Sequence, residues 1–275
     1  MIVKAISFTK KLYIKYFEDD IMAFSSQLAY NFLLASFPFL IFIFTLLSNF
    51  GLRKDILLSL MKNVLPSNAY ILVTDTLYET MKQKHNTLMS ITLLLALWTA
   101  SIGFNAVVRG INRAYNLKET RPFLKRQITN IVNTLILALS IVLTMMILIL
   151  IRMENAALIK STGYSELFDF LWQVLKYGII GAFLIFIFAA LYKYAPSVRL
   201  GWKQVMPGAI FTVMIWLPVS VIFSFYTNNY ARYSDLYGSL TAVIVLMIWM
   251  FVSSNIILIG GEINSILNQK NLKKR

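Results

Sequence analysis

Five charged side chains stand at the ends of long apolar stretches of this chain, and they are the residues best placed to do chemistry. They are Asp19, Asp20, Arg109, Arg113 and Glu262. At about 1.5 Å of rise per helical residue, Arg109 and Glu262 lie about 30 Å along their apolar runs, the thickness of a hydrocarbon core. An unpaired charge at that position is costly. We therefore expect an ion-pair cluster in which Glu262 meets Arg109 or Arg113 and an aspartate completes it.

Such a cluster has two interpretations. As a structural clamp it would join helix ends and carry no ligand. As a gate or a substrate-binding group it would open or close a path through the protein. The residue types alone are compatible with both roles, so the sequence leaves the two open.

A second group of polar residues lies within the apolar stretches and is neutral. It consists of Gln27, Asn31, Pro38, Asn105 and Asn255. Gln27 and Asn31 are four residues apart and share a helical face, and Pro38 lies seven residues further on. A lipid-facing helix would not tolerate this line, so the face must meet protein or water. We expect these five residues to line a substrate path for an uncharged or zwitterionic solute, since an amide cannot titrate.

The composition indicates that membrane-spanning helices position these groups. Hydrophobic residues make up 58% of the 275 residues, charged residues 14%, and the mean hydropathy is +0.68. A soluble domain carries about a quarter charged residues. The sequence predicts an all-α polytopic membrane protein forming a single domain over 1–275. The six predicted spans are about 20–48, 88–108, 128–151, 174–194, 206–226 and 238–267.

The basic residues predict the orientation of these spans. Of the 26 Lys and Arg, 17 fall in the N-terminal segment, the second and fourth connections and the C-terminal tail, against 8 in the alternate connections. By the positive-inside bias, both termini face the cytoplasm of a bacterial inner membrane. We read 1–18 as an interfacial helix on anionic lipids, or else as a solvated lead-in. The 49–87 connection would form amphipathic cover outside, with a lid as the alternative.

Glycine and proline add two expectations about helix packing. Gly260 and Gly261 should let the sixth span approach a neighbour closely beside Glu262. Pro207 should occupy the first turn of the fifth span, where proline is tolerated, and Pro218 should kink that span.

Several chemistries find no support in the residues. The chain has no cysteine and one histidine, His85, so thiolate and His/Asp metal sites of ordinary ligand spacing are not expected. Motifs for ATP, dinucleotides or a nucleophilic serine are absent, and no cofactor is predicted. The basic residues lie on short loops, as topology requires, so nucleic acid is not expected as a partner.

Taken together, four stretches of the chain resemble the YihY/BrkB family of bacterial inner-membrane proteins. They are AYNFLLASFPFL at 29–40, the run from Trp98 to Tyr115, LYKYAPSVRLGWKQVMPGAI at 191–210, and YGSLTAVIVLMIWMFVSSNIILIGGEIN at 237–264. The resemblance implies an integral membrane protein of six helices. Some members are linked to virulence or serum resistance, transport or export has been proposed, and a ribonuclease label has been attached to the family.

Positions that match the family pattern carry no assigned chemistry. They are Pro38, Asn112, Arg113, Gly238 and Glu262. We expect a transporter or exporter of a small polar solute or lipid-like molecule that is not driven by ATP. The alternative is a non-transporting protein that organises the envelope, and an enzyme, including a ribonuclease, is not expected. Substrate, direction, coupling and homo-oligomerisation are left open.

Overall fold

The structure is a computed structural model that describes residues 2–49, 74, 86–158, 166–229 and 238–272. Within these ranges it contains seven α-helices and one short 3-10 helix, and no strand. The elements are α1 (Ile2–Glu18), α2 (Ile21–Asn49), α5 (Asn86–Ala114), α6 (Phe123–Leu158), α7 (Glu166–Tyr194), α8 (Trp202–Asn229), η1 (Gly238–Leu240) and α10 (Thr241–Leu272). The all-α prediction is confirmed. The predicted 49–87 cover and His85 lie almost entirely outside the described residues.

Two helices of the described part are long and apolar enough to cross a membrane. They cover Trp202–Thr227 in α8 and Val243–Asn268 in α10, and a shorter apolar helix covers Gly178–Tyr194 in α7. Large apolar side chains are exposed along α8, among them Met214, Val221 and Ile222, which suits a lipid-facing surface. These features are those of a membrane protein. Six spans and cytoplasmic termini stay predictions.

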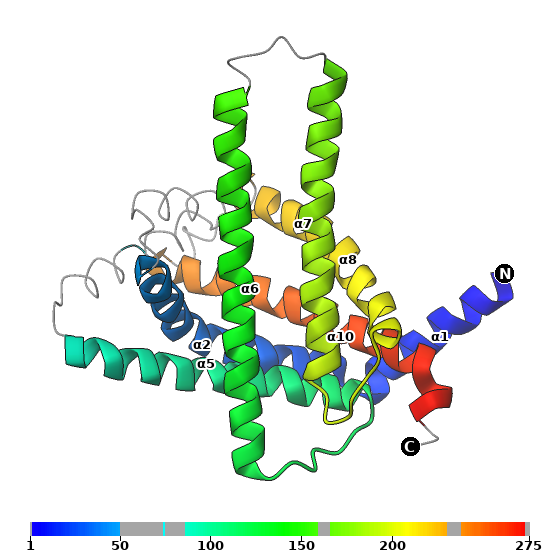
Figure 1. Ribbon diagram of the computed structural model, residues 1–275. Coiled ribbons are helices and arrows are strands. Elements are labelled where there is room, and N and C mark those ends of the chain that lie inside the picture. The colour runs from blue at the N-terminus through cyan, green and yellow to red at the C-terminus, as the bar shows by residue number, and fades with distance from the viewer. Residues whose placement is uncertain (1, 50–73, 75–85, 159–165, 230–237, 273–275) are drawn as a thin grey trace.

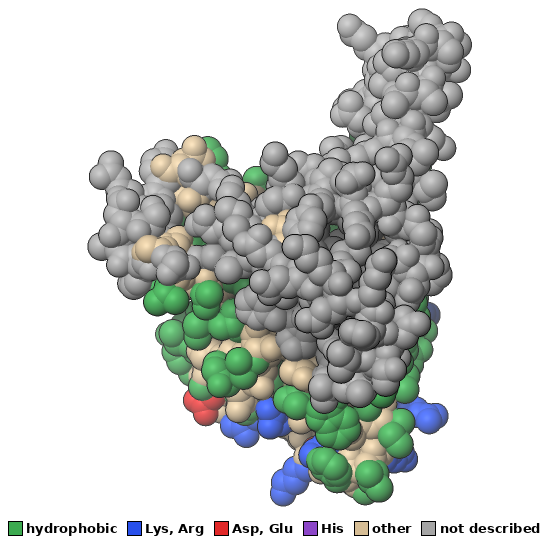
Figure 2. All heavy atoms as spheres, turned by 90° about the vertical axis from the view of Figure 1, so that its left-hand side faces the viewer, with side chains coloured by type: hydrophobic (Ala, Val, Ile, Leu, Met, Phe, Trp, Pro, Cys, Tyr) green, Lys and Arg blue, Asp and Glu red, His purple; other side chains and the backbone are tan. Residues whose placement is uncertain are grey.

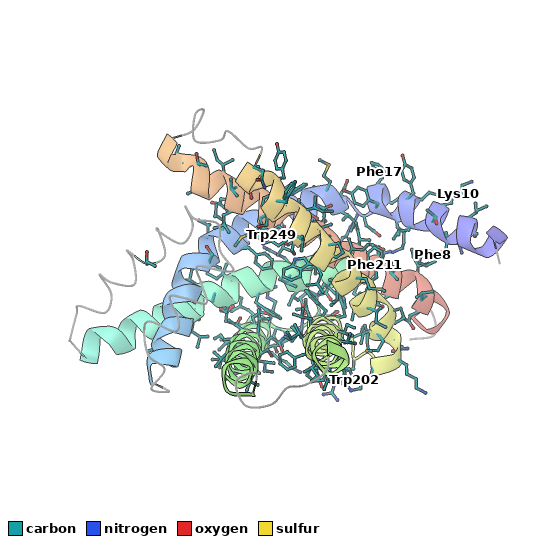
Figure 3. The ribbon with its side chains drawn as sticks, turned by 90° about the horizontal axis from the view of Figure 1, so that it is seen from above. Phe8, Lys10, Phe17, Trp202, Phe211 and Trp249 are labelled. Carbon is teal, nitrogen blue, oxygen red and sulfur yellow. The ribbon has the colours of Figure 1, made fainter. Side chains whose placement is uncertain are left out.

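The helices do not form one parallel bundle. α2 packs along α5 and α10, and α10 also packs against α8. α6 and α7 stand side by side and cross the other helices steeply in Figure 1, and Figure 3 shows these two helices end-on. The buried core lies where the helices cross, with Val108 and Ile111 of α5, Tyr192 of α7, Val205 of α8 and Leu258 of α10.

The first two helices are separated by a sharp break at Asp19 and Asp20. Asp20 has a φ of 50°, a left-handed conformation that ends α1 and lets α2 begin at Ile21. Figure 3 shows α1, with Phe8, Lys10 and Phe17 labelled, reaching outward from the crossing helices. The break therefore turns the C-terminal end of α1 toward the core and leaves its N-terminal half outside.

The start of the fifth predicted span differs from the expectation. α8 begins at Trp202 rather than near 206, so Pro207 lies inside the helix and not in its first turn. The reason is tertiary, since side chains of α10 bind the backbone around this proline.

Basic side chains gather at one edge of the molecule. Figure 2 shows Lys and Arg along its lower edge, the level at which Figure 1 places the connection between α5 and α6. The exposed side chains here include Lys118 of the α5–α6 connection, Lys125 in the first turn of α6 and Lys203 in the first turn of α8. Their grouping is what the positive-inside bias predicts for a cytoplasmic face.

Candidate functional site

A group of charged and polar side chains joins the end of α1 to the end of α5 and to α10. We call it the charged junction and define it as Lys15, Asp19, Arg113, Glu262 and Ser265, together with the backbone carbonyl of Ala114. The break after α1 places Asp19 one turn beyond Lys15. Because α5 ends at Ala114, its last carbonyl is free of a helical donor and faces the same group.

Lys15 is the centre of the charged junction. Its Nζ donates to Glu262 Oε2 at 2.7 Å, to the Ala114 carbonyl at 3.0 Å, to Ser265 Oγ at 3.2 Å and to Asp19 Oδ2 at 3.3 Å. An ammonium has three N–H groups, so four oxygens share three donors. The side chains of Lys15 and Glu262 are 12% and 1% exposed. The ammonium is therefore held in a nearly closed oxygen cage.

Arg113 completes the charge balance from the outer side. Its Nε lies 3.6 Å from Asp19 Oδ1, and its Nη2 donates to the Glu18 carbonyl, the last carbonyl of α1, at 3.3 Å. A cation at a helix C-terminus is favourable because the helix dipole is negative there. Two cations thus meet two carboxylates, and the junction is neutral as a whole.

Two buried oxygens beside the cage have no hydrogen-bond partner among the described residues. They are Glu262 Oε1 and the Tyr115 hydroxyl, which lies near Glu262 and Asn264. Burial raises the pKa of the Tyr115 hydroxyl, and the nearby Tyr192 and Glu262 act in the same direction. The hydroxyl stays protonated and can donate. Glu262 Oε1 and the Tyr115 hydroxyl therefore have hydrogen-bonding capacity that the members of the charged junction do not use.

The sequence predicted Arg109 or Arg113 as the partner of Glu262, and the structure instead places Lys15 there. Arg113 binds Asp19, while the side chains of Arg109 and Asp20 are exposed, away from Glu262. Sequence reasoning missed Lys15 because it is one of four lysines in the 1–18 segment, which we interpreted as an interfacial helix. The signal that could have found it is its i,i+4 spacing to Asp19, which puts both on one face.

The predicted path residues are not joined into one site. Gln27 is exposed, and Asn31 Nδ2 donates to the Gln27 carbonyl of its own helix at 2.6 Å. Asn255 Oδ1 accepts from the Tyr16 hydroxyl of α1 at 3.0 Å. Asn105 is half-buried, and its Oδ1 has no hydrogen-bond partner in the described part. α2 continues through position 38, but the Pro38 side chain lies outside the described residues.

A second junction, between α8 and α10, is built from neutral amides; we call it the amide junction. Asn264 Oδ1 accepts from the Gly208 N–H at 2.7 Å, and its Nδ2 donates to the Val205 carbonyl at 3.1 Å. Asn268 Nδ2 donates to the Gln204 carbonyl at 2.8 Å. Pro207 lacks an N–H and disturbs the local ladder, so these amides satisfy backbone groups beside it.

Glycine and a buried tyrosine bring α7, α8 and α10 together at the amide junction. A β-carbon at Gly208 would meet the Gly260 carbonyl and Asn264, and one at Gly260 would meet Thr212 and the Tyr192 hydroxyl. That hydroxyl bonds Thr212 Oγ1 and donates to the Ile257 carbonyl, each at 2.7 Å. Gly260 therefore permits the close approach, and its partner on α8 is Gly208.

Asn112 ties two connections at the basic edge. Its Oδ1 accepts from the Ser197 N–H at 2.8 Å, and its Nδ2 donates to Glu119 Oε2 at 3.1 Å. Arg121 binds the same carboxylate with its Nη2 at 2.6 Å, and this hydrogen bonding lowers the pKa of Glu119. The Asn112 side chain therefore fixes the two loops to each other.

The oxygen cage fits a monovalent cation better than a transition metal. Within the described ranges no group of three or more His, Cys, Asp or Glu could hold a metal ion. The cage offers two carboxylates, a hydroxyl and a carbonyl, and its position at the end of α5 uses the negative pole of that helix. It can hold an ammonium group, as it does with Lys15.

Comparisons with known proteins give the family of the chain. The chain matches the family described as "Virulence factor BrkB" over residues 12–275. It is 37% identical over 265 residues to "Putative ribonuclease-like protein YfkH" of Bacillus subtilis (strain 168), covering 96% of each chain. It is 27% identical over 172 residues to "UPF0761 membrane protein PSHAa0171" of Pseudoalteromonas translucida (strain TAC 125), covering 59% of this chain and 52% of the relative.

A third relative extends the match over most of both chains. The "UPF0761 membrane protein" of Tolumonas auensis (strain DSM 9187 / NBRC 110442 / TA 4) is 23% identical over 262 residues, which cover 93% of this chain and 83% of the relative. No solved structure matches the chain. With its apolar helices and a family match over nearly its whole length, the chain belongs to the BrkB family of membrane proteins.

Proposed function

We propose that this protein is a transporter or exporter of a small polar solute or a lipid-like molecule, without ATP as its energy source. The path runs between α2, α5 and α10, and the charged junction lies at its cytoplasmic end. Asn31, Pro38, Asn105 and Asn255 are the proposed lining residues, spread along the path rather than joined in one cluster. Gln27 is exposed and is left out of the lining, and Glu262 with Asp19 and Arg113 is proposed to control the entrance.

The observation that carries this proposal is a set of unsatisfied polar atoms inside apolar helices. Ser25 Oγ, Asn105 Oδ1, both polar atoms of the Asn130 side chain and Ser254 Oγ are buried without a hydrogen-bond partner among the described residues. They come from α2, α5, α6 and α10. A buried polar atom without a partner costs about 1–3 kcal/mol, which favours a role in contacting water or a polar solute.

Accessibility to water tests the proposal before any substrate is known. The chain has no native cysteine. Single cysteines placed at Ser25, Asn105 and Ser254 should react with a small charged methanethiosulfonate reagent in intact membranes. Matched controls are cysteines at Leu94 and Val221, apolar positions 69% exposed on the outer surface of the helices, where lipid should exclude the reagent.

The result also separates the proposal from its alternative. If the three inner positions are as unreactive as the two controls, the helices form a dry packed unit. That outcome would favour a non-transporting protein that organises the envelope. If they react, Asn105→Leu should block the efflux of whichever solute differs between cells lacking and overproducing the protein.

The proposed setting is the bacterial cytoplasmic membrane, with six spans and both termini inside. The basic edge would face anionic lipids, in keeping with the exposed Lys118, Lys125 and Lys203. Fusing alkaline phosphatase, which is active only outside the cytoplasm, after residue 120 or after residue 160 tests this orientation. The first fusion should be inactive and the second active, and the reverse pattern would invert the topology.

The name of the Bacillus subtilis relative raises RNA hydrolysis as another activity. We propose no enzymatic activity for this chain, because its single histidine and its lack of a candidate nucleophile motif offer no catalytic group for that reaction. Purified protein incubated with transfer RNA precursors should leave them intact. Cleavage that co-purifies with the protein and disappears in a Glu262→Gln variant would overturn this view.

A further inference from the structure

The contacts of Lys15 describe a binding site for a cation as well as a salt bridge. Four oxygens from four different residues surround one ammonium: a carboxylate of α10, a carboxylate at the α1–α2 break, a serine hydroxyl and the last carbonyl of α5. Lys15 is the only member carried by the body of α1. The helix that supplies the cation is thus distinct from the elements that supply most of the oxygens.

The cage keeps unused polar atoms beside the ammonium. Glu262 is fully buried, and its Oε1 has no hydrogen-bond partner among the described residues. Tyr115 is 3% exposed, its hydroxyl has no partner in the described part, and it lies near Glu262. A pure salt bridge in a closed site needs its remaining lone pairs satisfied. These two oxygens show that the Lys15 ammonium leaves part of the hydrogen-bonding capacity of the site unused.

The net charge of the cage without Lys15 indicates which class of ligand it would bind. Arg113 balances Asp19, and Lys15 balances Glu262. If Lys15 leaves, the cage holds one net negative charge in a nearly closed site, which one positive charge neutralises. Two carboxylates, a hydroxyl and a carbonyl are oxygen ligands suited to a small monovalent cation or a primary ammonium.

α1, which carries Lys15, is largely exposed and projects from the other helices. α1 packs against α10 and α2, but Ile6, Tyr13 and Phe17 along its length are 63%, 66% and 59% exposed. Figure 1 shows its N-terminal half standing away from the other helices. Besides the contacts of Lys15, two hydrogen bonds hold this helix: one from the Tyr16 hydroxyl to Asn255 and one from Arg113 Nη2 to the Glu18 carbonyl.

We propose that the oxygen cage of Asp19, Ala114, Glu262 and Ser265 is a binding site for a small monovalent cation, and that Lys15 is its tethered occupant. Docking of α1 and binding of a free cation then exclude each other. The site stands whether or not the protein transports a solute, since its binding reaction is separate from any flux.

Removing the tethered ammonium tests the site directly. Lys15→Ala should be less stable than the wild type in tetramethylammonium chloride, whose cation is too large for the cage. Sodium or methylammonium chloride at equal ionic strength should raise its melting temperature by roughly 3–6 °C. The wild type and Lys11→Ala, which removes an exposed lysine of the same helix, should show no such difference between salts.

A second substitution assigns the effect to the cage. In Lys15→Ala/Glu262→Gln the salt-specific shift should disappear, because the neutral amide no longer demands a cation. If all three salts act alike on Lys15→Ala, or if only a lower pH stabilises it, the cage takes a proton or nothing, and the proposal is overturned.

A measurement on the unmodified chain covers the case in which Lys15→Ala does not fold. The rate at which an amine-acetylating reagent modifies Lys15, read by mass spectrometry, should rise at least about twofold in sodium chloride over tetramethylammonium chloride, with Lys11 as the internal control. This follows from competition between the free cation and the tethered one. Equal rates at Lys15 in the two salts would mean that no free cation competes for the cage.

Discussion

The two polar junctions on α10 are close in sequence and opposite in character. Glu262 and Ser265 point to the charged junction, while Asn264 and Asn268 point to the amide junction. At the amide junction Asn264 binds an N–H and a carbonyl of α8, and Tyr192 binds Thr212 and a carbonyl of α10. At the charged junction, Glu262 Oε1 has no such partner among the described residues.

This difference gives the two junctions on α10 different roles. Neutral amides and hydroxyls with matched partners, packed through Gly208 and Gly260, fix α8 on α10. Among the described residues, Asn264, Tyr192 and Thr212 have no buried side-chain atom without a hydrogen-bond partner. At the charged junction, four oxygens share the three N–H groups of Lys15. This contact holds the projecting helix α1 and leaves Glu262 Oε1 without a partner among the described residues. One face of α10 is therefore a permanent contact with α8. The neighbouring face is the one at which we propose that Lys15 exchanges with a free cation.

The largest expected effect is at the charged junction. Glu262→Leu leaves the Lys15 ammonium without its closest carboxylate and should lower the free energy of unfolding by about 3–5 kcal/mol. In Lys15→Met/Glu262→Leu no charge is left unpaired between these two positions, so the double variant should lose clearly less than the sum of the single losses. Chemical denaturation in detergent measures all three. Additive losses would show that the pair is not coupled.

The next effect probes the close packing at the amide junction. Gly208→Ala places a methyl group against the Gly260 carbonyl and should cost about 1–3 kcal/mol, since the backbone cannot yield as a side chain does. The matched control is Gly178→Ala in α7, where a β-carbon meets nothing within 4 Å. Thermal unfolding in detergent compares them. A control as damaging as the test would remove the argument for close approach.

A smaller effect is expected from the amide itself. Asn264→Ala leaves the Gly208 N–H without its acceptor and should cost about 1–2 kcal/mol. Asn229→Ala removes an exposed amide whose hydrogen bond, within the described part of the chain, is to the Phe225 carbonyl of its own helix. It should change stability by less than about 0.5 kcal/mol. If Asn264→Ala is as mild as this control, the backbone around Pro207 does not depend on α10.

The smallest effect concerns the loop contact of Glu119, outside both junctions. Because Arg121 lowers the pKa of Glu119 in the folded protein, the carboxylate stabilises the fold above its ordinary pKa of about 4.5. This contribution is lost as the pH falls through the lowered value. The melting temperature of the wild type should therefore exceed that of Glu119→Gln at pH 6, and the gap should shrink toward pH 3. A gap that widens on acidification would contradict the assigned direction.

The sequence by itself determined the helical class, the family, the position of most helices and the importance of Glu262. Long apolar runs can form only helices in a bilayer, and an acidic residue inside such a run demands a partner. Helical rise placed Arg109 and Glu262 at a similar depth along their apolar runs. These inferences depend on local periodicity and composition, which do not change with the fold.

Only the tertiary structure decided which cation reaches Glu262 and how α8 tolerates Pro207. Lys15 and Glu262 are 247 residues apart, and the break at Asp20 sets the direction from which α1 arrives. Asn264 and Asn268 looked like ordinary polar residues near a helix end until the approach of α8 placed backbone groups within their reach. Which side chains pair depends on the distance between helices. The spacing of residues along one helix gives no information about that distance.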